Sequence, residues 1–346
     1  MRRFAAILLL GLAPWRSEAQ ATREAAAVTS LTIFAGTARG LYRSRDWGGS
    51  FELVAGRSPG DRLEGLGGVG CILPLGPQVL IGADSGVYHS PDFGETWKRV
   101  ATSGPCEALL GSRYPLADRT LFLGTPAGLL RSVPDLFLPE DTARDFAATP
   151  IAEARVARLD WPGPKLFVAT SKGLFVSSDA ATKLVPVGVD GPAPLPAGEV
   201  TALVVSAFFS ADPALVVAVD GAGVFRSSDA GARWSHAGLA GRRVNDLIWL
   251  GPFLYAATDL GVFRTEDLGR NWVALNDGLE RRAATRLLFP LAPASGADAF
   301  LGTDRGVFWT GDGGLHWRAL GGSLAGEAIR VLATFPQPDP VQKKRR

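Results

Sequence analysis

One short pattern recurs seven times along the chain, and its spacing limits the folds that the chain can adopt. The clearest copy begins at Gly261, reads Gly-Val-Phe-Arg-Thr-Glu-Asp-Leu-Gly-Arg-Asn-Trp, and ends at Trp272. The copies begin at glycines that lie about 44 residues apart on average, namely Gly40, Gly86, Gly128, Gly173, Gly223, Gly261 and Gly306. A repeat of this length is typical of solenoids, propellers and arrays.

The content of each repeat favours strands over helices. An apolar run such as Val200–Val205 is followed by a run that ends in Gly-Thr or Ala-Thr, by the run after the repeated glycine, and by a run that begins at tryptophan. Short β-branched and aromatic runs between Gly and Asp turns predict strands. Four short strands per repeat predict an all-β fold, a seven-bladed β-propeller of four-stranded antiparallel blades.

The two ends of the repeat array complement each other. Only three predicted strands precede the second repeat, whereas the run 328–334 follows the last tryptophan and matches the innermost strand of the other repeats. We therefore predict that this C-terminal strand completes the first blade and closes the ring. Closure removes the open sheet edges that invite aggregation.

The turn Ser/Thr-x-Asp-x-Gly-x-x-Trp is the signature of the repeat, although Phe51 replaces the Trp in the first copy. The copy from Gly173 lacks the later Gly and Trp, and the Asp of the copy from Gly128 comes one residue late. The aspartate can accept hydrogen bonds from the backbone of its own turn, and the tryptophan can pack between sheets. This turn resembles the Asp-box, or BNR repeat, of sialidases, xyloglucanases, sortilin-type receptors and the photosystem II stability/assembly factor group. We predict a structural role for its aspartates, which are Asp46, Asp92, Asp135, Asp179, Asp229, Asp267 and Asp312.

Among these families, the single compact propeller most resembles the photosystem II stability/assembly factor group. The resemblance implies an assembly role, in which a non-catalytic scaffold binds a protein partner through its loop-rich face. Members of that group carry basic residues on the propeller face. The alternative is a carbohydrate-active protein, either a degenerate, sialidase-like glycosidase or a glycan-binding module.

Residues suited to catalysis are scattered. Tyr42, Tyr88 and Tyr255 occupy repeat strand positions, and His89 and His316 lie in different repeats, as does His236. The spacing shows no metal-ligand set, phosphate loop or nucleotide fingerprint. The formal net charge of +2 gives no basic field for nucleic acid. We predict a protein that is not an enzyme and that takes no cofactor, metal or nucleic acid.

Charged residues in the innermost strands are the first candidates for a binding site. Alignment of these strands places five of them beside the central channel: Arg158, Arg286, Arg330, Asp246 and Glu107. They form either an internally paired polar lining or a site for an anion or partner. The connectors between blades add further binding candidates on one face of the disc, because ligand-binding residues commonly lie on loops held by a rigid scaffold. These candidates are Arg57, Arg62, Arg242, Arg243, Arg281 and Arg282.

The N-terminus has the pattern of a secretory signal. Arg2 and Arg3 precede an apolar run over residues 4–13, and Ala19-Gln20-Ala21 provides a cleavage site. We expect cleavage after Ala21, a propeller domain over 22–340, a basic tail over 341–346 and a periplasmic or secreted monomer without a transmembrane segment.

The two cysteines begin the inner strands of neighbouring repeats. An oxidising compartment permits a disulfide between Cys71 and Cys106. Their alignment is offset by two residues, so two buried free thiols are the other possibility.

Overall fold

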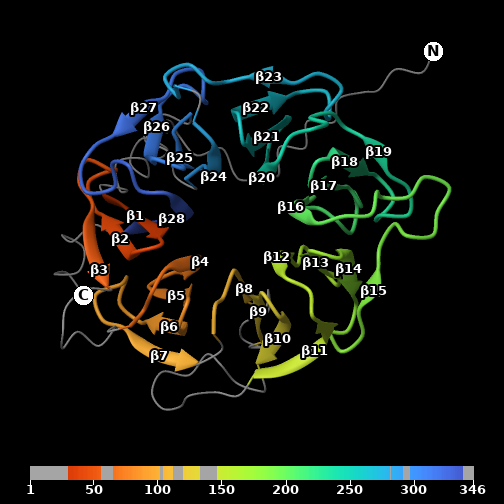
Figure 1. Ribbon diagram of the computed structural model, residues 1–346, viewed down its shortest axis with the longest axis horizontal. Helices are drawn as coiled ribbons and strands as arrows, with labels where there is room; N and C mark the ends of the chain where they lie inside the picture. The colour runs from red at the N-terminus through yellow and green to blue at the C-terminus, as the bar shows by residue number, and fades with distance from the viewer. Residues whose placement is uncertain are drawn as a thin grey trace, which may run out of the picture.

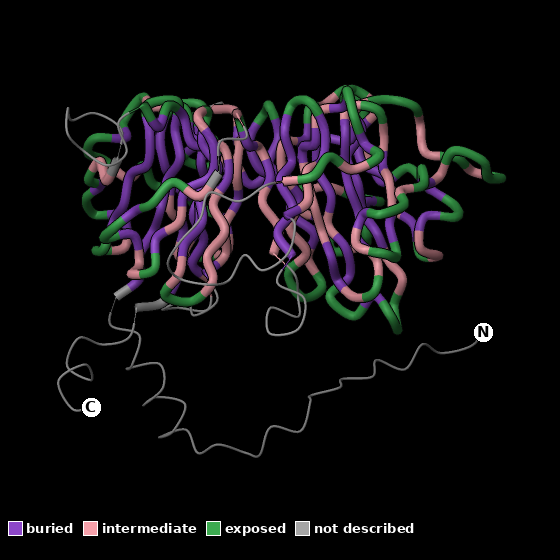
Figure 2. Tube along the Cα trace, turned by 90° about the horizontal axis from the view of Figure 1, so that it is seen from below, coloured by how far each residue is buried: buried purple, intermediate pink, exposed green. Residues whose placement is uncertain are grey.

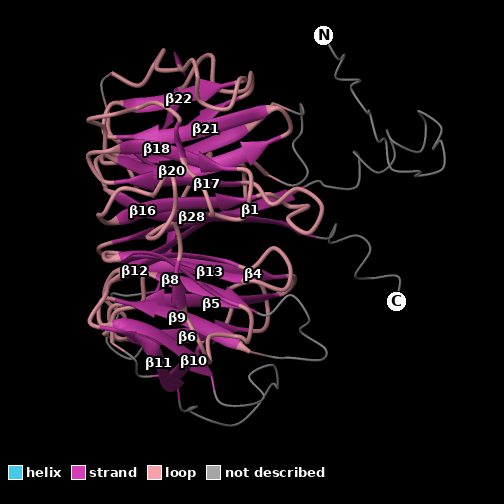
Figure 3. Cartoon of the chain, turned by 90° about the vertical axis from the view of Figure 1, so that its right-hand side faces the viewer, coloured by secondary structure: helices cyan, strands magenta, loops and turns pink. Residues whose placement is uncertain are grey.

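Seven sheets, each of four antiparallel strands, stand around a central axis (Figure 1). The computed structural model describes residues 30–55, 65–101, 104–111, 120–132, 146–280, 282–290 and 297–337. All of the regular structure in these ranges is β, and the strands run across the thickness of the disc (Figure 3). The predicted seven-bladed propeller is confirmed.

The four strands of each blade follow one another outward from the central channel. Blade 1 consists of β28 (Ile329–Gln337), β1 (Ser30–Thr37), β2 (Gly40–Ser44) and β3 (Glu52–Ala55). Blade 2 consists of β4 (Val69–Leu75), β5 (Gln78–Ala83), β6 (Gly86–Ser90) and β7 (Lys98–Ala101). Blade 3 consists of β8 (Ala108–Gly111), β9 (Leu121–Thr125), β10 (Gly128–Ser132) and β11 (Phe146–Ala152). Blade 4 consists of β12 (Val156–Asp160), β13 (Leu166–Thr170), β14 (Gly173–Ser177) and β15 (Val185–Pro186). Blade 5 consists of β16 (Val200–Val205), β17 (Leu215–Val219), β18 (Gly223–Ser227) and β19 (Ser235–His236). Blade 6 consists of β20 (Val244–Leu250), β21 (Phe253–Thr258), β22 (Gly261–Thr265) and β23 (Val273–Ala274). Blade 7 consists of β24 (Ala284–Leu288), β25 (Ala299–Thr303), β26 (Gly306–Thr310) and β27 (Arg318–Leu320).

The C-terminal strand completes the first blade, as predicted. Strand β28 pairs antiparallel with β1 along its length, from Ser30 opposite Gln337 to Thr37 opposite Ile329. Phe335 of β28 packs on Phe34 of β1, with ring centroids 5.2 Å apart. The two ends of the described chain therefore meet in one sheet.

The repeated glycine begins the third strand of every blade and takes a backbone conformation that side chains disfavour. Gly261 has a φ of 101°, and a Cβ atom there would lie 2.2 Å from Asn276 Oδ1. Glycine alone adopts this region at no steric cost. The turn between the second and third strands therefore requires glycine as the first residue of the pattern.

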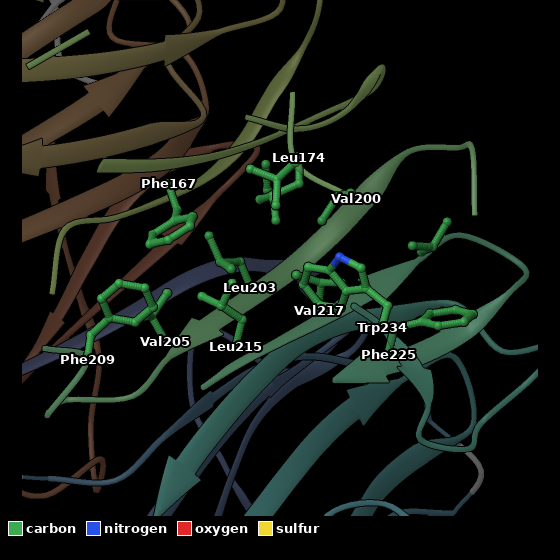
Figure 4. Packing of buried hydrophobic residues seen from close by; sticks show 13 residues of the cluster. Phe167, Leu174, Val200, Leu203, Val205, Phe209, Leu215, Val217, Phe225 and Trp234 are labelled. Atoms are coloured by element: carbon green, nitrogen blue, oxygen red, sulfur yellow. The ribbon is translucent and has the colours of Figure 1, made fainter. Parts of the chain in front are cut away.

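Apolar layers between neighbouring blades form the core. In the layer between blades 4 and 5, Phe167 of β13 and Leu203 of β16 pack with Leu215 of β17 and Trp234 (Figure 4). Buried residues run through the wall of the disc, and exposed residues lie mainly at its two faces (Figure 2). Each layer is a small core, so the ring can grow beyond the size of a single-core domain.

The aspartate turns join the third and fourth strands on one face of the disc. Ser227 Oγ donates to Asp229 Oδ1 at 2.8 Å, and Asp229 Oδ1 accepts the Arg233 N–H at 2.9 Å. The same pair of bonds closes the turns at Asp46, Asp92, Asp179, Asp267 and Asp312. The connectors between blades and the turns between second and third strands lie on the opposite face, which we call the connector face.

The third repeat ends in an outer strand whose pairing with its neighbour contains a register shift. The stretch from Pro134 to Pro150 is compatible in sequence with either a degenerate strand or a loop, and residues 146–152 form β11, the outer strand of blade 3.

Several predicted features lie outside the described residues: the signal over 1–21 with its cleavage after Ala21, the tail over 341–346, Asp135, Arg57, Arg62 and Arg281. Within the described ranges, no helix has the length and apolarity needed to cross a bilayer.

Candidate functional site

Six of the innermost strands, all except β8, have a β-bulge where they enter the sheet from the connector face. In β12, Val156 pairs with Thr170 and Arg158 with Ala169, so Ala157 is the inserted residue. The other inserted residues in paired inner strands are Gly70, Thr201, Asn245, Thr285 and Arg330. A bulge redirects the side chains around it, and both the inserted residue and its successor line the channel in β12, β20 and β24.

Polar side chains at the bulge join one blade to the next. Thr201 Oγ1 donates to Val244 O at 2.6 Å, Asn245 Nδ2 to Ala284 O at 2.9 Å, and Thr285 Oγ1 to Ile329 O at 2.7 Å. Each acceptor belongs to the residue just before the bulge of the following blade. These bonds hold the inner strands of blades 5, 6, 7 and 1 in a fixed arrangement around the channel.

A ladder of ion pairs crosses the mouth of the channel. Arg155 Nη1 lies 2.6 Å from Glu107 Oε2, and Arg155 Nη2 also bonds to Glu199. Arg243 lies 3.7 Å from Glu199 and 2.9 Å from Asp220. Burial alone would lower the pKa of Arg155, but its bonds to the two glutamates raise that pKa above its ordinary value. The ladder therefore links the inner edges of blades 3, 4, 5 and 6.

A second charged group lies deeper in the channel. Asp246 lies between two arginines, 4.0 Å from Arg158 Nε and 3.8 Å from Arg286 Nη1. Its carboxylate also accepts the Leu287 N–H at 3.1 Å. Burial raises the pKa of Asp246, and the charge of Arg158 opposes that rise. Arg158 Nη2 donates to Asn245 O at 2.7 Å, which fixes its guanidinium against the channel wall.

These side chains surround a cavity of about 550 Å³ at the connector face, and a smaller one of about 200 Å³ lies further along the inner strands. Five arginines line the wider cavity: Arg155, Arg158, Arg243, Arg286 and Arg330. Asp84 and Glu107 are the carboxylates among its lining residues. We call this cavity the channel mouth.

Two arginines at the channel mouth keep donor capacity. Within the part of the chain that the structure describes, Arg286 donates to Asn245 O at 3.3 Å and Arg330 to Asp84 at 3.4 Å. A guanidinium has five N–H donors. The channel mouth can therefore bind a group rich in hydrogen-bond acceptors, such as a carboxylate or a run of peptide carbonyls.

The innermost-strand candidates named from the sequence lie together around the channel. Arg158, Arg286, Arg330 and Glu107 line the channel mouth, and Asp246 lies below it. Arg243 joins them from the end of a connector.

Two connector candidates lie elsewhere. Arg282 lines a separate hollow of about 490 Å³ with Leu260, Asn276 and Leu279, and its guanidinium stacks 5.3 Å from the Phe308 ring. Arg242 is absent from the described lining of the channel mouth.

Sequence reasoning missed Arg155, Glu199 and Asp84. Arg155, Glu199 and Arg243 each immediately precede an inner strand, at one shared position of consecutive repeats. These three residues alternate in charge. A strand alignment that included the residue immediately before each inner strand would have revealed that signal.

The two cysteines lie side by side, with Cys71 Sγ 3.4 Å from Cys106 Sγ, and both are buried free thiols. The two-residue offset in the strand alignment does not separate them, because Cys106 precedes β8 and packs against the neighbouring strand β4.

No family model and no curated protein matches the chain. Solved structures do match. The chain is similar to the extracellular domain of the putative one-component system BT4673 from B. thetaiotaomicron, with a TM-score of 0.56 and 15% identity over 72% of this chain and 33% of that chain. It is also similar to an ancestral GH74 enzyme, with a TM-score of 0.55 and 19% identity over 72% of this chain and 38% of that one.

A third similar structure is that of YCF48 bound to D1 peptide. Its TM-score is 0.52 and its identity 12%, over 72% of this chain and 80% of that chain. The likeness is one of fold. This chain spans 33% and 38% of the first two structures and 80% of the third, and what it shares with them is the propeller fold.

Proposed function

We propose that this protein is a non-catalytic scaffold that binds a segment of a protein partner at the channel mouth. The observation that carries the proposal is the set of arginines held on rigid inner strands around a cavity of about 550 Å³. The donor capacity of Arg286 and Arg330 matches the carbonyl and carboxylate groups of a peptide. We further propose that it acts outside the cytoplasm, as the N-terminal signal pattern predicts.

Rigidity of the site supports this reading. The bulge bonds between blades and the ladder from Glu107 to Asp220 fix the lining before any ligand arrives. A preorganised site loses less side-chain entropy on binding. The structure named YCF48 bound to D1 peptide provides a precedent for a peptide ligand on a propeller of similar fold.

Substitution of the two arginines with spare donors tests the site. We expect Arg286→Gln combined with Arg330→Gln to weaken partner binding at least about tenfold, because each charged hydrogen bond contributes about 1.5–3 kcal/mol. Arg270→Gln is the matched control, since Arg270 is exposed in an aspartate turn on the opposite face. Affinity capture from an envelope extract, quantified by mass spectrometry, compares the three proteins.

The result is informative either way. A partner retained by the wild type and by R270Q, and lost by the double variant, supports the channel mouth as the binding site. Equal retention by all three proteins would contradict it. The thermal midpoint of each variant shows whether a loss of binding reflects a loss of folding.

The second candidate is a carbohydrate-active protein. The observation in its favour is that Glu199 and Glu107, the latter in the lining of the channel mouth, both contact Arg155. A glycosidase needs two carboxyl groups on the two sides of the scissile bond, one as acid and one as base or nucleophile. Here both glutamates are paired with the same guanidinium, so we favour the scaffold. Release of reducing sugar from a glycan by the wild type, lost in Glu107→Gln, would reverse that preference.

A further inference from the structure

Cys106 occupies a repeat position that the other blades fill with aliphatic side chains, and Cys71 of the neighbouring blade packs against it. Cys106 of blade 3 aligns with the residue just before the bulge in the other blades, which is Val69, Val156, Val200, Val244, Ala284 or Ile329. Cys71 follows the bulge of β4 in blade 2. Both side chains are buried, with exposed fractions of 6% and 2%.

Gly82 of β5 makes room for the two sulfur atoms. A Cβ atom at Gly82 would lie 2.4 Å from Cys71 Sγ and 2.7 Å from Cys106 Sγ. The equivalent Gly124 and Gly302 face aliphatic carbons instead, Val156 Cγ1 at 2.8 Å and Ile329 Cγ2 at 2.7 Å. The space beside Gly82, between blades 2 and 3, therefore holds two sulfur atoms, whereas the spaces beside Gly124 and Gly302 hold aliphatic carbons.

We propose that Cys71 and Cys106 form a disulfide site that cross-links blades 2 and 3. The sulfurs lie 3.4 Å apart and must approach to about 2.05 Å, which rotation of two short side chains can accomplish. The backbones are already adjacent, since Cys71 Sγ also contacts Cys106 O at 3.4 Å. Formation of the disulfide replaces the contact between Cys106 Sγ and Ala108 O, which lie 3.3 Å apart.

The reaction is thiol–disulfide exchange with a small-molecule disulfide. One cysteine thiolate attacks the reagent, expels one thiolate and forms a mixed disulfide. The second cysteine then attacks the protein sulfur and releases the other reagent thiolate. Both cysteine protons leave to solvent, two protein thiols are oxidised, and one reagent disulfide is reduced to two thiols.

The disulfide forms during folding, before blades 2 and 3 pack against each other. Burial raises the pKa of the Cys71 thiol well above its ordinary value, and Cys106 adds to the rise. The thiolate is the attacking species, so the folded, reduced protein reacts slowly. During folding both thiols are exposed to the reagent.

Oxidative refolding tests the site. The full chain is unfolded, reduced and refolded with glutathione disulfide, and thiols are then counted with a maleimide in denaturant. We expect a monomer without free thiols and a linked pair of peptides containing Cys71 and Cys106. We also expect the thermal midpoint to be several degrees higher than in the reduced protein, since the bond closes a loop of about 35 residues in the unfolded chain.

Cys106→Val is the control, because valine occupies the same position in most other blades. This variant should fold, and its thermal midpoint should not respond to reductant. Two free thiols in the correctly refolded wild-type monomer would overturn the proposal. So would a thermal midpoint that is the same in the oxidised and reduced protein.

Discussion

Each turn aspartate within the described ranges accepts hydrogen bonds from the backbone of the turn that it closes. The Asn271 N–H donates to Asp267 Oδ1 at 2.9 Å, and the Asn271 side chain donates to Oδ2 at 2.6 Å. The backbone bond, together with the Thr265 hydroxyl and the Asn271 amide, lowers the pKa of Asp267 from its usual 3.8 to about 2. Hydrogen bonds to the charged form favour that form. Folding therefore favours the ionised turn.

Stability should fall in acid for this reason. The folded pKa of Asp267 lies below its unfolded value, so its contribution is complete above about pH 4 and is lost as the pH falls through about 2. The pKa values of five other turn aspartates are also lowered: Asp46, Asp92, Asp179, Asp229 and Asp312. We expect the urea midpoint, followed by tryptophan fluorescence, to decrease between about pH 5 and pH 2.

Asp267→Asn separates charge from hydrogen bonding, because asparagine keeps an acceptor oxygen but cannot ionise. Its urea midpoint should depend less on pH than that of the wild type. Asp259→Asn, at an exposed turn on the connector face, serves as the control. An identical pH slope in the wild type and D267N would rule out the turn carboxylate as a source of acid sensitivity.

At the scale of the strand, β28 determines whether the ring is closed. It supplies the inner strand of blade 1 and packs Ile329, Leu332 and Phe335 into the core. Without it, β1 would present an unpaired edge, and such edges promote association. Burial of one large apolar side chain contributes about 1.5–3 kcal/mol.

A chain that ends at Glu327 should therefore lose at least about 5 kcal/mol, which is comparable to the whole stability of many domains. We expect no cooperative thermal transition by circular dichroism, or a strongly lowered midpoint. A chain that ends at Pro340 keeps β28 and lacks only the predicted basic tail, so its midpoint should match the full-length protein. Equal midpoints in both truncated chains would show that β28 does not close the ring.

The strands were predictable where the turns constrain the sequence. Gly261 needs a positive φ, Asp267 needs a turn to close, and both recur, so the period of the blades follows from them. The ion-pair ladder was not predictable in the same way. Arg155 and Glu199 precede their strands, and their contact depends on how neighbouring blades pack. Arg286 and Arg330 were found because they lie within the strands that alignment brings together.

At the scale of the whole molecule, the two faces of the disc differ. Aspartate turns close the outer hairpins on one face, whereas the channel mouth opens on the other. The formal net charge is only +2, so long-range attraction gives little help to association. We therefore expect binding to depend on the local arrangement of arginines and carboxylates at the mouth.

The most direct test of that account is site-specific photo-cross-linking from the two faces. Lys172 is exposed beside the channel mouth, since the neighbouring Ser171 Oγ accepts the Arg155 N–H at 3.1 Å. Arg270 is exposed on the opposite face. A photoreactive phenylalanine analogue is placed at either position, and linked peptides are identified after irradiation in an envelope extract. If the partner binds at the channel mouth, we expect one partner segment to be linked from position 172 and none from position 270. Links from position 270 alone would contradict it.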